Sequence, residues 1–158
     1  MPMTKREIDR LLAEPNVAVV AVTAPNGAPH AVPIWYEYRK GEVVFLTDAR
    51  SYKCKCLLRD PRVALCVDVR KPPYKSVVLK GRVTMEEKID DERMERMAIA
   101  YMGKKAGREY ASQFKGEPVA VVRFKTRTHN LVGLRQGWQC YQDHRRPQPF
   151  HHDQVRCR

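Results

Sequence analysis

The sequence predicts a mainly β protein, a small antiparallel β-barrel of about six strands with a few short helices. Three observations support this class. Short runs of apolar, often β-branched residues recur along the chain, turn residues separate most of them, and segments with helical spacing are few and short. The 158 residues suffice for one domain, whose core needs no disulfide bonds at this size.

The first 47 residues are expected to form a helix and then a three-stranded antiparallel meander. Apolar residues recur at helical spacing over residues 4–13, where Thr4 is a suitable N-cap. The strands that follow are separated by an Asn-Gly turn and a Lys-Gly turn. Their expected ranges are 17–23, 30–38 and 43–47.

The middle of the chain repeats the pattern of short helices between strands. Helices are expected over 51–59, with Ser51 as N-cap, over 89–102 and over 108–114. Strands are expected over 62–69, 76–86 and 118–125. Periodicity is lost after Thr126, so we expect a domain over residues 1–141 and an irregular or flexible tail over 142–158.

The net charge of +12 indicates an anionic partner. Positive charge is concentrated between Arg50 and Arg82, where ten lysines and arginines face two aspartates, a local charge of +8. This segment contains only Tyr52 and Tyr74 as aromatic residues, which disfavours nucleic acid and favours an anionic small molecule.

The junction near Ser51 is the strongest candidate for a phosphate site. A strand ends at Thr47, and a helix begins after Ser51 with Lys53 and Lys55 in its first turns. Free N–H groups and the positive end of the helix dipole favour a phosphate there, and a hydroxyl and an ammonium would complete the site. The alternative interpretation is an ordinary N-cap with solvated lysines.

The remaining features predict a cytoplasmic protein with no metal site. The charged N-terminal segment has no apolar core of a secretory signal, and no apolar run is long enough to span a bilayer. The five cysteines, an odd number, lack zinc-binding spacing, as expected for reduced cytosolic thiols.

Several segments taken together resemble the pyridoxamine 5'-phosphate oxidase-like superfamily, over about residues 5–126. The chain is most similar to its branch of small flavin- and deazaflavin-dependent reductases. The matching segments, in order, are EPNVAV (14–19), PNG (25–27), PIWY (33–36), LLRDPRVAL (57–65), PPY (72–74) and VVLKGRV (77–83).

This resemblance implies a split β-barrel, usually a homodimer with two cofactor sites at the subunit interface, and a cofactor that is FMN or the deazaflavin coenzyme F-420. The cofactor phosphate is expected at Thr47, Ser51, Lys53 and Lys55, and its ring along Pro33, Ile34, Trp35 and Tyr36. Of Trp35 and Tyr36, one is expected in the core and the other against the ring. Tyr74 is expected to reach across the dimer.

The expected function is that of an oxidoreductase that transfers a hydride from the reduced cofactor to a small unsaturated or quinone-like molecule. The sequence has no nucleophile–base signature, so no catalytic residue is assigned and the chemistry would belong to the cofactor. Because no acid–base residue stands out, a protein of the same fold that binds flavin, haem or a tetrapyrrole without turnover remains the alternative.

Overall fold

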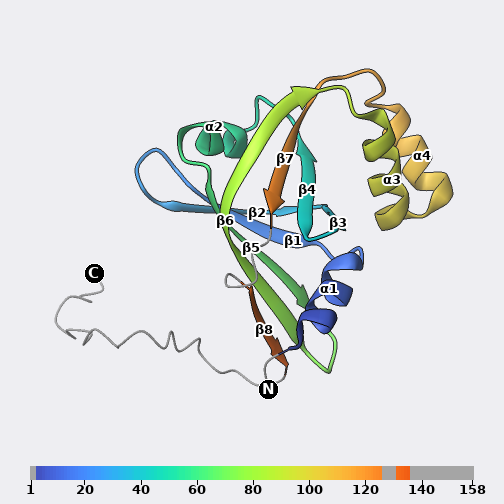
Figure 1. The fold of residues 1–158 in the computed structure, drawn as a ribbon. Helices are drawn as coiled ribbons and strands as arrows, with labels where there is room; N and C mark the ends of the chain where they lie inside the picture. Colours follow the sequence, from blue (N-terminus) through green and yellow to red (C-terminus); the bar gives the residue numbers. More distant parts are fainter. Residues whose placement is uncertain (1–2, 126–130, 136–158) are drawn as a thin grey trace, which may run out of the picture.

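The computed structural model describes residues 3–125 and 131–135, in which it contains four helices and eight strands (Figure 1). The helices are α1 (Lys5–Ala13), α2 (Tyr52–Arg59), α3 (Asp91–Met102) and α4 (Lys104–Ser112). The strands are β1 (Ala18–Thr23), β2 (Pro29–Ile34), β3 (Glu37–Arg39), β4 (Glu42–Thr47), β5 (Arg62–Val69), β6 (Lys75–Lys88), β7 (Val119–Lys125) and β8 (Leu131–Arg135). The mainly β class predicted from the sequence is confirmed.

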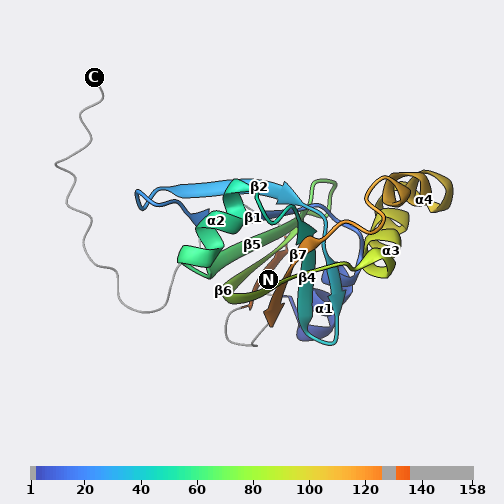
Figure 2. The same cartoon turned by 90° about the horizontal axis from the view of Figure 1, so that it is seen from above.

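The strands form one antiparallel sheet in the order β2-β1-β5-β6-β7-β4-β3, and β8 pairs with β6. The two ends of this order, β2 and β3, are consecutive in the chain and are separated by two residues, Trp35 and Tyr36. So short a link requires the sheet to curl until its ends approach each other, which produces the half-open barrel seen in Figures 1 and 2. The long strand β6 makes the curl, because its first half pairs with β5 and its second half with β7.

The structure corrects the expected N-terminal meander. The segment expected as one strand over 30–38 is interrupted at Trp35 and Tyr36, so that β2 pairs with β1 and β3 pairs with β4. The backbone N–H of Tyr36 has left the ladder and donates to the Tyr101 hydroxyl at 3.1 Å. This hydroxyl also lies 2.9 Å from the Asn16 carbonyl. A contact from a distant helix therefore replaces the missing strand pairing, and sequence periodicity carries no sign of it.

The strand count also exceeds the expected six. The division at Trp35 adds one strand, and β8 forms where the sequence shows no periodicity, by pairing with the first half of β6. The tail expected over 142–158 lies outside the described residues. No helix in the described part of the chain is long and apolar enough to cross a bilayer.

Gly81 lies on β6 where the strand passes from one neighbour to the other. A Cβ atom there would lie 2.5 Å from the Phe124 ring, so only glycine lets β6 approach this ring so closely. Phe124 belongs to the main core inside the barrel, together with Phe45 and Leu57. Glycine is therefore required here by packing against the core.

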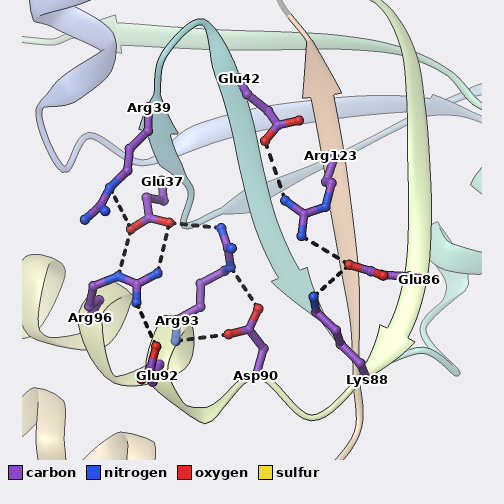
Figure 3. Close-up of polar contacts among 10 residues, drawn as sticks. All are labelled: Glu37, Arg39, Glu42, Glu86, Lys88, Asp90, Glu92, Arg93, Arg96 and Arg123. Atoms are coloured by element: carbon purple, nitrogen blue, oxygen red, sulfur yellow. Dashed lines mark hydrogen bonds and ion pairs between the residues drawn. The ribbon is translucent and has the colours of Figure 1, made fainter.

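Helices α3 and α4 form a hairpin on one side of the barrel, and α2 lies on the other (Figures 1 and 2). Met94 of α3 packs on a small second cluster formed by Val44, Val119 and Val121 on β4 and β7. Ion pairs also hold α3 against β3 (Figure 3). The Glu37 carboxylate on β3 accepts from Arg93 at 3.0 Å and from Arg96 at 3.1 Å, both on α3.

Candidate functional site

The N-terminus of α2 has the features expected for an anion site. Ser51 caps the helix, its hydroxyl accepting from the Cys54 N–H at 3.4 Å and lying 3.5 Å from the Thr47 hydroxyl. The N–H groups of Tyr52 and Lys53 have no acceptor among the described residues. Two free donors at the positive end of a helix are suited to a phosphate oxygen.

Lys53 is half-buried, and its ammonium has no carboxylate partner within the described residues. Arg62, by contrast, is paired with Asp60 at 2.6 Å. A half-buried cation without a counterion is stabilised when an anion binds beside it.

Lys53 reaches a cavity of about 470 Å³, which we call the Lys53 cavity. Its wall is apolar and aromatic, apart from the lysine itself. The lining residues are Val17, Pro33, Ile34, Trp35, Leu46, Lys53, Met94, Met97 and Tyr110. A cavity of this size with an apolar wall and one charged group has the character of a small-molecule site.

Trp35 lines the Lys53 cavity and packs against two tyrosines. Its ring stacks on Tyr101 with centroids 5.0 Å apart and lies at a tilt to Tyr110 at 5.4 Å. Burial raises the pKa of the Tyr101 hydroxyl, which therefore stays protonated and donates to the backbone near the strand break. The strand break thus positions Trp35 between the barrel and the helical hairpin.

A second cavity of about 670 Å³ adjoins the first, with which it shares Leu46, Met94 and Tyr110. We call it the Phe114 cavity. It is bounded by the loop from Thr47 to Arg50, the end of β6 and the residues around Phe114 that precede β7. The two cavities together form a recess between α2, the barrel and the α3–α4 hairpin.

The structure brings together four of the residues predicted for the site and separates the others. Pro33, Ile34, Trp35 and Lys53 line the same cavity, although about 20 residues separate the strand from the helix. Thr47 lines the Phe114 cavity, and Ser51 contacts Thr47.

Tyr36, Lys55 and Tyr74 line neither cavity. Tyr36 is 3% exposed and belongs to the core, as expected for one residue of the Trp35–Tyr36 pair. Lys55 is exposed on α2, and Tyr74 is exposed in the loop between β5 and β6.

The helical hairpin contributes residues to both cavities that the sequence pattern does not mark as site residues. Met94 and Met97 of α3 both line the Lys53 cavity. Tyr110 lies in a segment expected to be helical and borders both cavities. No local signal marks it, because only the folding of α4 back along α3 brings its ring to Trp35.

The three cysteines of the described residues line neither cavity. Cys54 and Cys56 are buried and unpaired, and burial raises the pKa of the partly buried Cys66 thiol. Lysines flank Cys54 in the sequence, but its side chain is 1% exposed, which prevents a reagent from reaching it. Within the described residues, no group of three histidine, cysteine, aspartate or glutamate side chains is placed to hold a metal ion.

Comparisons with known proteins relate the chain to one family. A family model described as pyridoxamine 5'-phosphate oxidase matches residues 4–132. The structure is similar to a conserved hypothetical protein from Mycobacterium tuberculosis, which is 25% identical with a TM-score of 0.61; the match covers 79% of this chain and 81% of that one. A comparison with curated proteins gives no match.

Two further solved structures have the same fold. An F-420 reductase is 19% identical, with a TM-score of 0.60 and coverage of 75% of this chain and 93% of that one. An FAD-binding protein from Mesorhizobium loti is 20% identical, with a TM-score of 0.62 and coverage of 87% and 98%.

Proposed function

Because the chain belongs to the pyridoxamine 5'-phosphate oxidase family, we propose that it is an oxidoreductase that uses FMN or the deazaflavin coenzyme F-420 to reduce a small unsaturated or quinone-like substrate. One observation carries the proposal most directly: the unpaired Lys53 lies beside the capped N-terminus of α2 and borders an apolar cavity. A planar ring carrying a phosphate needs both features in one place.

The residues present fit such a cofactor. Its phosphate would accept from the N–H groups of Tyr52 and Lys53 and pair with the Lys53 ammonium, with the Thr47 and Ser51 hydroxyls close by. Its ring would lie against Pro33 and Trp35 in the Lys53 cavity. When bound, the cofactor supplies the hydride chemistry, and the chain positions it and excludes water from it.

The solved structures support a flavin or deazaflavin as the cofactor, since one is an F-420 reductase and another an FAD-binding protein. The chain is also similar to the structure of an FAD and heme binding protein from Mycobacterium smegmatis. This similarity supports the alternative that the chain binds its cofactor without turnover. The absorbance spectrum of the purified protein, titrated separately with FMN, F-420 and haem, distinguishes these possibilities. Tight binding of haem alone would favour the alternative.

Replacing Lys53 with alanine is expected to weaken cofactor binding by about 1.5–3 kcal/mol, or about 10- to 150-fold in Kd, because a charge-assisted hydrogen bond to the phosphate is lost. Ser51→Ala should cost less, since the helix N–H groups remain. Fluorescence titration with FMN and F-420 measures both values. Lys71→Ala, which removes an exposed lysine on the β5–β6 loop, is the matched control. An unchanged Kd for Lys53→Ala places the phosphate elsewhere.

We also propose that the protein is a cytoplasmic homodimer with sites at the subunit interface. Support comes from the exposed apolar side chains of Val17, Tyr74 and Ile89, which are 48%, 56% and 57% exposed. Val17 also borders the Lys53 cavity, so a partner that covered it would close this site. Size-exclusion chromatography with light scattering should give twice the chain mass, and a monomer at micromolar concentration would contradict the dimer.

A further inference from the structure

The Phe114 cavity has a charge opposite to that of the protein as a whole. Three carboxylates and one guanidinium border it: Asp48, Glu87, Glu117 and Arg50. Arg50 lies nearest Asp48, with Nε and Oδ1 3.9 Å apart. Glu87 and Glu117 have no basic partner in the described part of the chain. The residues that border the cavity carry a net charge of −2, whereas the whole protein carries +12. The negative charge of this cavity therefore comes from its own carboxylates and not from the average surface, which is basic.

The wall of the same cavity is aromatic. The rings of Tyr110 and Phe114 are 5.1 Å apart at 49°, and Tyr110 continues the row to Trp35 in the neighbouring cavity. Aromatic faces attract planar rings by stacking and attract cations through the ring quadrupole. The Tyr110 hydroxyl has no partner within the described residues, so a ligand can use it without breaking an existing contact.

From this cavity we infer a second ligand site that takes a planar aromatic ring carrying a positive charge. The ring would stack on Tyr110 and Phe114, and its charge would face Glu87 and Glu117. An anionic ring is disfavoured by the two carboxylates, and an aliphatic cation would leave the rings unused. The volume of about 670 Å³ is in the range of small-molecule sites.

The two adjoining cavities thus differ in charge, and they share Leu46, Met94 and Tyr110 as a common wall. The Lys53 cavity suits an anion, and the Phe114 cavity suits a cation. We take the cationic ring to be the substrate of the reaction, and this identification rests on the proposed function. The existence of the second ligand site rests only on the Phe114 cavity.

Two probes of nearly equal shape test the inference on the cofactor-free protein. Acridine is uncharged at mildly alkaline pH, and 10-methylacridinium is its permanently charged counterpart; both are fluorescent. We expect the cation to bind about tenfold more tightly than acridine, because carboxylate attraction and cation–π contacts act on the charged ring alone. The basic protein surface opposes this preference, so unspecific binding cannot produce it.

Variants test which side chains cause the preference for the charged probe. In Glu87→Gln/Glu117→Gln the tenfold preference should fall to about twofold or less, and Phe114→Leu should weaken both probes about fivefold. The control Glu92→Gln/Glu109→Gln removes two exposed carboxylates of α3 and α4 that line neither cavity and should keep the preference. All four glutamates are exposed, so folding is expected to be unaffected, which a thermal melt checks.

Equal affinity of the wild-type protein for both probes, or a preference that survives Glu87→Gln/Glu117→Gln, overturns the inference. Failure of this inference can be told apart from failure of the proposed function. Lys53→Ala should leave 10-methylacridinium binding within about twofold, because Lys53 does not line the Phe114 cavity. Failure of FMN and F-420 to bind while the cation binds as expected contradicts the proposed function alone.

Discussion

Replacing Leu57 with alanine is expected to lower the free energy of unfolding by about 3 kcal/mol, within the range for a fully buried leucine. Leu57 is 1% exposed and joins α2 to the main core, so its loss removes apolar burial and leaves a cavity. For a protein of this size the melting temperature should fall by roughly 6–12 °C. Urea unfolding followed by circular dichroism measures the change.

The adjacent Leu58 provides the matched control, since it lies on the same helix and is 74% exposed. Alanine is a slightly better helix former than leucine, so Leu58→Ala should change stability by less than about 0.5 kcal/mol. Equal effects of the two substitutions would show that α2 does not pack on the barrel as described. Because Lys53 lies one turn before Leu57, loosening α2 should also weaken cofactor binding.

Replacing Glu37 with glutamine is expected to destabilise the protein by about 2–3 kcal/mol and to loosen the α3–α4 hairpin. The Glu37 side chain is 15% exposed. Its carboxylate accepts from Arg93 at 3.0 Å and from Arg96 at 3.1 Å, and it forms an ion pair with Arg39 at 3.3 Å (Figure 3). Removing the charge leaves a cluster of guanidinium groups without their shared acceptor, which is costly in a partly buried site.

Asp90 keeps Arg93 in place and so limits the loss of stability in Glu37→Gln. Burial alone would raise the pKa of Asp90, but hydrogen bonding to Arg93 at 3.0 Å holds it below its usual value, so this carboxylate stays charged. Arg93 thus retains one partner in Glu37→Gln, whereas Arg96 keeps only the distant Glu92.

Hydrogen exchange should show faster exchange in α3 and α4 of Glu37→Gln while β5 and β6 remain protected. The control is Glu92→Gln: Glu92 is 94% exposed, and its oxygen lies 3.8 Å from Arg96, so its loss should cost at most a few tenths of a kcal/mol. Identical exchange in wild type and Glu37→Gln would contradict the role of this cluster in docking the hairpin.

The local elements of this protein could be predicted from the sequence because their signals lie within a few residues of each other. Thr4 and Ser51 cap α1 and α2 as expected, the former through a capping box with Glu7. Runs of β-branched residues gave β1, β5 and β7 nearly at their true bounds. The junction at Ser51 and Lys53 was recognisable for the same reason, since strand, cap and lysine are contiguous.

The assembled recess depended on contacts between segments far apart in the chain. Whether residues 30–38 form one strand or two is decided by Tyr101, which lies 65 residues from Tyr36 and takes over its N–H. Leu57 and Leu58 are equivalent in sequence, and only the packing of α2 on the barrel buries one of them.

The sequence by itself determined which segments become strands and helices, and it placed Ser51 and Lys53 together at the start of α2. Tertiary structure alone decided that Trp35 meets Lys53 in one cavity and that Tyr110 divides it from a second. The physical reason is that helix caps and periodic burial act over one or two turns, whereas a cavity exists only where curled strands and a folded-back hairpin leave space between them.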